Sequence, residues 1–259
     1  MLSRKIFNLT MSCIAVGIGV RATEISPDPI IHYRLDENSG STLVADTAAG
    51  RHDARIIVAQ PQFQSEFVPG QHGNAVKFRA DAPMRFVIPE NSVLKALKPP
   101  FTIAFWANPS HGYKNLWVFG NNDGGISVRI FYQMFDFRWT DQNGVPHILQ
   151  TPKFSAAMNA MQHYAVVNDG QRIMLYINGE PQELSLHIRG AKIDSFHGRE
   201  YTGDAAELIP ANTAGDYAIG GYYYNFAYPF EGIIDDLCVF NRALSSDELV
   251  TVAAESCNP

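Results

Sequence analysis

The chain has 259 residues, a length at which an all-β protein is commonly a single domain. Its residues are 46% apolar and 18% charged, which excludes an intrinsically disordered chain. The net charge is −6, and it becomes −9 without residues 1–22, because these contain three basic residues and no acidic ones. A domain this acidic is unsuited to binding nucleic acid or anionic lipid, so we expect no nucleic-acid partner.

Residues 1–22 have the pattern of a secretory signal peptide. Arg4 and Lys5 form a basic start, and the apolar run 11–20 leads to a small-residue cleavage site. The run is too short to span a membrane, which takes about 20 residues. We therefore expect a secreted or periplasmic protein with one domain over 23–259. The alternative is an N-terminal arm outside the fold.

From residue 28 onward, short apolar segments alternate with Gly, Pro, Asn and Asp. More than ten such segments predict an all-β sandwich or barrel. The expected strands are 30–35, 54–58, 75–78, 85–89, 101–109, 116–120, 126–133, 134–140, 147–150, 163–167, 172–177, 217–220 and 233–240.

Two turns are well specified. Asn-Asp-Gly-Gln at 168–171 and Asn-Gly at 178–179 supply residues that tolerate the positive φ of tight hairpins, and they predict a meander. Phe105 and Trp106 are adjacent, so both faces of their strand are expected to meet apolar material. The stretch 183–215 has no clear pattern and is interpreted as a long excursion between strands.

One helix is predicted near the C-terminus. Ser245 and Glu248 form a capping box, and Leu244 and Leu249 flank it as a hydrophobic staple. We expect this short helix to pack on the edge of the sandwich.

Several sequence blocks occur in a fixed order along the chain. They are HYRLDENSG (32–40), VADT (44–47), GNAVKF (73–78), FTIAFW (101–106), HYAVV (163–167), LYING (175–179), GIIDDL (232–237) and FNRAL (240–244). Together they resemble the laminin-G-like domains of the concanavalin A-like lectin and glucanase superfamily. The resemblance implies a jelly roll of two antiparallel sheets, a carbohydrate- or protein-binding role and, in many members, a calcium ion near the rim.

Four acids are candidate calcium ligands. Asp36 and Asp46 flank the first turn region, and Asp235 and Asp236 lie on the last strand, which is commonly a neighbour of the first in a jelly roll. Calcium takes about six to eight oxygen ligands, so their convergence would form a site. In the alternative interpretation, the first two bond their own turns and one of the last two pairs with Arg242.

Two cysteines would remain in the exported domain. An even number in an oxidising compartment permits a disulfide between Cys238 and Cys257. The alternative is a pair of buried free thiols.

The run YYYNFAYPF at 222–230 is the candidate ligand-binding segment. Tyrosine offers an apolar ring and a hydroxyl, a combination suited to stacking on sugars. In strand geometry Tyr222 and Tyr224 would face one way and Tyr223 the other. We expect the ligand, a carbohydrate or glycoprotein, to contact a set comprising Tyr222, Tyr223, Tyr224, Tyr228 and, from a second strand, Trp139.

The leading hypothesis is thus an exported, lectin-like and non-catalytic binding module. A polysaccharide lyase or glycoside hydrolase on the same fold is the first alternative. His197, Arg199 and Tyr201 are the residue types of a lyase, whereas the paired carboxylates of a glycosidase strand are absent from the sequence. No Gly-x-Ser-x-Gly or His-Glu-x-x-His motif occurs. A protein-binding adhesion module is the second alternative.

Overall fold

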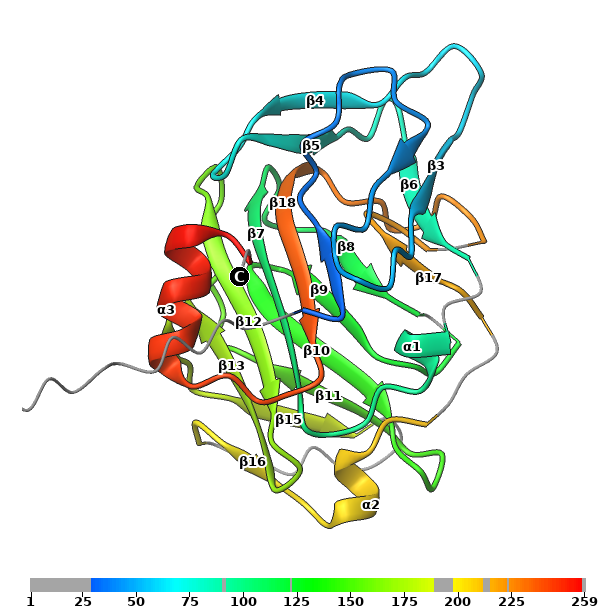
Figure 1. Cartoon of the computed structure of the whole chain (residues 1–259). Coiled ribbons are helices and arrows are strands. Elements are labelled where there is room, and N and C mark those ends of the chain that lie inside the picture. The colour runs from blue at the N-terminus through cyan, green and yellow to red at the C-terminus, as the bar shows by residue number, and fades with distance from the viewer. Residues whose placement is uncertain are drawn as a thin grey trace, which may run out of the picture.

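A computed structural model describes two antiparallel sheets and three helices (Figure 1). None of the helices in the described part of the chain is long and apolar enough to cross a membrane. The structure describes residues 29–89, 92–121, 123–188, 198–211, 215–222 and 224–257. The expected signal peptide, His197 and Tyr223 lie outside these ranges.

The first sheet has the strand order β14-β13-β12-β7-β18-β5-β4, with β1 beside β18 and β16 beside β13. The pairing of β1 with β18 places the first and last strands side by side, as expected from the sequence. Its strands are β1 (Ile31–Tyr33), β4 (Glu66–Pro69), β5 (Asn74–Phe78), β7 (Phe101–Pro109), β12 (Gln162–Asn168), β13 (Arg172–Ile177), β14 (Glu180–Pro181), β16 (Tyr201–Thr202) and β18 (Gly232–Phe240).

The second sheet has the order β15-β11-β10-β9-β8-β17-β6-β3-β2. The order is not sequential in either sheet, which confirms the jelly-roll arrangement of two antiparallel layers. Its strands are β2 (Leu43–Val44), β3 (Ala54–Val58), β6 (Met84–Ile88), β8 (Asn115–Gly120), β9 (Ser127–Phe131), β10 (Met134–Thr140), β11 (Pro146–Gln150), β15 (Ser185–Ile188) and β17 (Tyr217–Ile219).

The main core lies between the two sheets, where alternate residues of each strand point inward. Phe105 of β7 stacks on Tyr164 of β12 with ring centroids 5.4 Å apart, and Phe135 of β10 meets both rings from the opposite sheet. This period-two burial is the reason that the apolar segments form strands rather than helices. The expected bounds of β3, β7, β10 and β13 match the structure.

The excursion at 183–215 connects the two sheets. It adds β15 to the edge of the second sheet and β16 to β13 of the first, and it contains α2 (Ala205–Leu208). These short elements were not predicted, and neither were β4 and α1 (Ser92–Lys95). Two to four residues are too few to show a periodic pattern.

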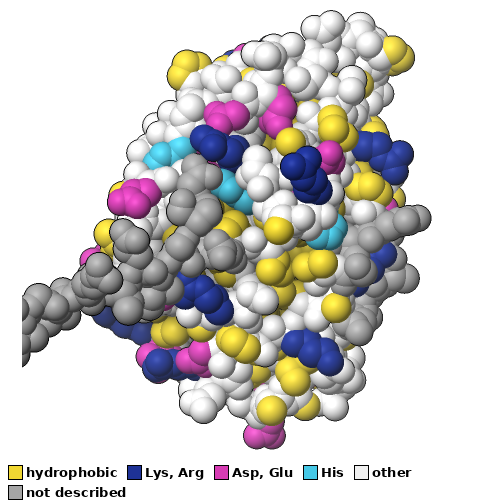
Figure 2. All heavy atoms as spheres, viewed as in Figure 1, with side chains coloured by type: hydrophobic (Ala, Val, Ile, Leu, Met, Phe, Trp, Pro, Cys, Tyr) yellow, Lys and Arg dark blue, Asp and Glu magenta, His cyan; other side chains and the backbone are white. Residues whose placement is uncertain are grey.

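The C-terminal helix α3 (Ser246–Glu255) begins at the predicted capping box. The Ser245 hydroxyl accepts from the Glu248 backbone N–H, and the Glu248 carboxylate accepts from the Ser245 N–H at 2.7 Å. The expectation that the helix packs on an edge was wrong. Leu249 and Val252 instead lie in a second apolar cluster on the outer face of the first sheet, because its central strands leave apolar residues there to be covered. Acidic and basic side chains are interspersed on the surface on this side (Figure 2).

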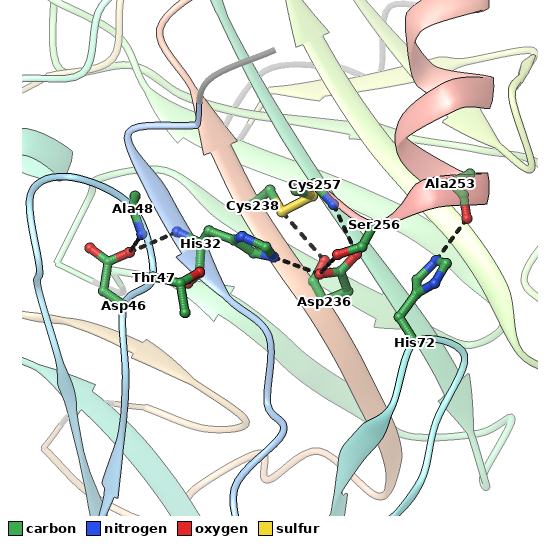
Figure 3. Close-up of a disulfide and its surroundings, with 10 residues drawn as sticks. All are labelled: His32, Asp46, Thr47, Ala48, His72, Asp236, Cys238, Ala253, Ser256 and Cys257. Carbon is green, nitrogen blue, oxygen red and sulfur yellow. Dashed lines mark hydrogen bonds and ion pairs between the residues drawn. A yellow bond between two sulfur atoms is a disulfide. The ribbon is translucent and has the colours of Figure 1, made fainter. Parts of the chain in front are cut away.

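A disulfide joins Cys238 of β18 to Cys257, just past α3, with Cα atoms 6.4 Å apart. The bond is possible because the helix lies back across the sheet and returns the chain to β18 (Figure 3).

We expect alkylation of the denatured, unreduced protein to modify neither Cys238 nor Cys257, because both sulfur atoms are engaged in the bond. Intact mass spectrometry before and after reduction measures this, and reduction should add two labels. Two labels without reduction would mean that the thiols are free in the exported protein.

Candidate functional site

A set of polar and aromatic side chains lies on the outer face of the second sheet. On β10, Phe137 and Trp139 point into the core, so Asp136 and Arg138 point outward. On the neighbouring β9, Arg129 is the register partner of Asp136 and also faces outward. We call this region, with the aromatic residues described below, the tyrosine–arginine cleft.

The base of the cleft is a buried ion-pair cluster. Both Arg129 and Arg138 contact the same oxygen, Oδ2 of Asp136, and their Nε atoms lie 3.1 and 3.0 Å from it. Arg129 and Asp136 are almost fully buried, whereas the side chain of Arg138 is 31% exposed. Burial raises the pKa of Asp136 to about 6, opposed by the charge of Arg129. Two cations thus share one carboxylate, which leaves the cluster with an excess of positive charge.

Aromatic residues from a different part of the chain cover one side of this cluster. The Tyr222 ring meets the Trp117 ring of β8 edge-on, with centroids 4.6 Å apart. The rings of Tyr228 and Tyr224 lie 5.3 and 6.0 Å from that of Tyr222. The backbone carbonyl of Tyr228 also accepts from the Trp117 N–H at 3.4 Å, which fixes the segment to β8.

Two of these rings are open to solvent. Tyr224 is 54% and Tyr228 50% exposed, while Tyr222 is partly buried against the sheet. The described residues around them form bends rather than a strand, so the alternation expected for strand geometry does not apply. Tyr223, a predicted ligand contact, lies outside the described residues.

A hollow of about 210 Å³ lies beside the aromatic cluster. It is lined by Trp117, Arg129, Arg138 and Tyr222, among others, and no acidic residue belongs to the described lining. The Trp117 Nε1–H has no hydrogen-bond partner among the described residues, but it is fully buried and not open to the hollow. The hollow therefore offers a ligand mainly the positive charge and N–H donors of its partly exposed arginine, Arg138.

Trp139 belongs to the lining of the hollow, but its ring is buried in the core. Its indole stacks on His147 with centroids 4.8 Å apart and donates from Nε1 to the Glu207 carbonyl at 2.6 Å. The side chain is buried in the core, because it occupies an inward position of β10. We therefore leave Trp139 out of the proposed ligand contacts.

The first two acids predicted to bind calcium are engaged by their own surroundings. Asp36 accepts from the Asn74 N–H at 2.7 Å and from Arg34 Nε at 3.0 Å. The buried carboxylate of Asp46 accepts from three backbone N–H groups, those of His32, Ala48 and His52, at 2.8 to 3.0 Å. The contacts of Asp46 with Ala48 and His52 match the turn-bonding interpretation, whereas Asp36 bonds the backbone of a different turn, at Asn74.

Asp235 lies on the outer face of β18 and accepts from the backbone N–H groups of Gln71 and His72 at 2.7 and 3.0 Å. Burial raises its pKa to about 7, and the neighbouring charge of Asp236 adds to this. The loop that supplies the two donors therefore covers this carboxylate.

Asp236 connects the first strand to the C-terminal segment (Figure 3). Its Oδ1 lies 2.7 Å from His32 Nε2 and accepts from the Ser256 hydroxyl at 2.8 Å. It does not pair with Arg242, which instead contacts Glu248.

Within the described ranges, the only group of His, Cys, Asp and Glu with ligand atoms close enough to share a metal ion is His32, Asp236, Cys238 and Cys257. Its two sulfur atoms form the disulfide, so they are not available as thiolate ligands. The four predicted acids do not converge, and their contacts do not fit one calcium ion held by all of them. Calcium binding itself stays a prediction.

The two described lyase candidates, Arg199 and Tyr201, do not form a common site. Arg199 is at the surface and pairs with Glu183 at 3.0 Å. Tyr201 is buried, with its ring 5.9 Å from that of Trp139, and its pKa is raised to about 12 mainly by burial. The third candidate, His197, lies outside the described residues.

The fold is a concanavalin A-like β-sandwich. The chain belongs to the Laminin_G_3 family of the concanavalin A-like lectin/glucanases superfamily, whose model matches residues 86–250. A comparison with curated proteins finds no match.

Solved structures share the fold at low sequence identity. The binding domain of botulinum neurotoxin serotype D has a TM-score of 0.59 and 14% identity, covering 87% of this chain and 50% of that one. The binding domain of Paraclostridial Mosquitocidal Protein 1 has a TM-score of 0.58 and 16% identity, with 87% and 52% covered. Domain 4 of an extracellular arabinanase from Geobacillus stearothermophilus, in complex with arabinotriose, has a TM-score of 0.57 and 18% identity, covering 88% of this chain and 99% of that one. This chain thus spans about half of the toxin domains.

Proposed function

We propose that the protein is an exported, lectin-like module that binds a glycan or a glycosylated surface through the tyrosine–arginine cleft, without catalysing a reaction. The observation that carries this proposal is the joining of exposed rings, Tyr224 and Tyr228, to an arginine-lined hollow on one sheet face. Rings stack on the C–H faces of sugars, and convergent polar groups fix a bound ligand's orientation.

Two further facts support a binding role. The superfamily is named for both lectins and glucanases, and domain 4 of the arabinanase, which has the same fold, was solved with arabinotriose. The signal-peptide pattern at 1–22 would bring the domain to extracellular glycans.

The test is a glycan array with residues 23–259, run once with calcium and once with a chelator. We expect binding to at least one glycan, and a loss of about tenfold or more in affinity for Tyr224→Ala combined with Tyr228→Ala, since each ring exposes about half of its surface to solvent. Loss of binding on chelation would establish the calcium requirement that the family resemblance implies.

The matched control is Phe154→Ala. This ring is 62% exposed and lies in the loop after β11, near the Met134 end of β10 and away from the hollow. Its removal should leave affinity unchanged. No binding to any glycan in either condition would contradict the proposal in favour of a protein partner, and product formed from a polyuronate would contradict the non-catalytic part.

A further inference from the structure

The two arginines of the cleft differ in how many of their nitrogen atoms contact Asp136. Arg129 directs both Nε and one terminal nitrogen at Asp136, and it is buried. Arg138 uses only Nε on that carboxylate, and it is partly exposed where it lines the hollow. The terminal NH₂ groups of Arg138 are therefore the charged donors that a ligand in the hollow can reach.

The position of Asp136 explains why this charge is not cancelled. Its carboxylate lies at the base of the cluster and is not among the residues that line the hollow. Two guanidinium groups share it, so one positive charge is uncompensated within the cluster. The chain as a whole is negatively charged, with a net charge of −6. The hollow differs from this average, because its described lining contains two arginines and no acidic residue.

The chemistry of the guanidinium favours an anionic ligand. A guanidinium can donate hydrogen bonds but cannot accept one. An acceptor group that carries negative charge therefore fits the terminal NH₂ groups of Arg138, and the planar fork of arginine matches a carboxylate in two parallel hydrogen bonds.

We infer that the cleft selects a carboxylated sugar, such as a uronic acid unit, and that the terminal NH₂ groups of Arg138 bind its carboxylate. This inference rests on the proposed function, because it names the class of glycan bound at the same site. Arg129 acts as a positioning residue that holds Asp136, and through it Arg138, in place.

The test compares three probes by calorimetry. They are a hexuronic acid trisaccharide, the same trisaccharide after reduction of its carboxyl groups, and a trisaccharide without carboxyl groups that carries sulfate. The wild-type protein should bind the carboxylated probe about tenfold or more tighter than the reduced one, as expected for a charge-assisted hydrogen-bond pair. Arg138→Gln should abolish this preference, so that the carboxylated and reduced probes bind with affinities within about twofold of each other. Arg138→Lys keeps the charge but not the fork, and should retain only part of the preference.

Arg199→Gln is the matched control, because it removes the same charge from a surface arginine outside the cleft. It should leave the preference intact. Equal affinity for the carboxylated and reduced probes would overturn this inference and leave the lectin-like function standing. Tighter binding of the sulfated than of the carboxylated probe would overturn the choice of carboxylate. If the protein binds none of the probes and none of the arrayed glycans, both proposals are overturned.

Discussion

Replacing Asp46 by Ala is expected to lower the free energy of unfolding by about 4 kcal/mol, or the midpoint of thermal unfolding by roughly 10 °C. The buried carboxylate accepts from the backbone N–H groups of His32, Ala48 and His52. Its removal leaves these donors buried or half-buried without the acceptor, and each unsatisfied buried group costs about 1–3 kcal/mol. Urea denaturation followed by tryptophan fluorescence measures the change.

Asp36→Ala is the matched control, since both acids were predicted as calcium ligands. Asp36 is partly exposed and accepts one backbone N–H, from Asn74, besides its contact with Arg34. Its replacement should cost about 1 kcal/mol. Equal losses for the two variants, together with a wild-type protein that unfolds at a lower temperature in chelator, would contradict the hydrogen-bonding explanation and indicate a shared ion.

The fold could be predicted from the sequence because its signals are local. Apolar segments between turn residues mark the long strands, Asn-Asp-Gly and Asn-Gly turns mark the hairpins, and Ser245 with Glu248 marks the start of α3. The site of helix docking could not be predicted in the same way. It depends on which strands leave apolar residues on the outer face of the first sheet, and this follows from strand order rather than from the helix itself.

The site could be predicted only in part. The tyrosine run was recognised by composition, but its partner Trp117 lies over 100 positions earlier in the chain and is brought to it by sheet packing. Arg129, Asp136 and Arg138 were missed, although charged residues alternating with aromatic ones in FDFRWT point to an outer face. The same alternation assigns Trp139 to the core. The pattern that identifies Arg138 as an outward residue therefore also argues against Trp139 as a ligand contact.

Arg129→Met is expected to destabilise the protein by about 3 kcal/mol, because it removes the buried cation beside the buried carboxylate of Asp136, which keeps the partly exposed Arg138 and the side chain of Gln150 as partners. The double variant with Asp136→Leu removes both buried charges and should recover most of this loss at pH 7. Urea denaturation of the two single variants and the double variant gives the coupling free energy, which should be about 2 kcal/mol. Additive single effects would contradict a direct interaction.

The pH dependence separates this explanation from a simple packing defect. Burial raises the folded-state pKa of Asp136 to about 6, above its value of about 4 in the unfolded chain, so the folded state holds the proton more tightly. The protonated acid therefore favours folding below about pH 4, and this contribution is lost as pH rises to about 6. The wild-type protein, which keeps Asp136, should accordingly lose about 2 kcal/mol relative to the double variant between pH 4 and pH 6.5. A pH-independent difference would mean that Asp136 is ionised at its ordinary pKa, and that the arginines fully offset its burial.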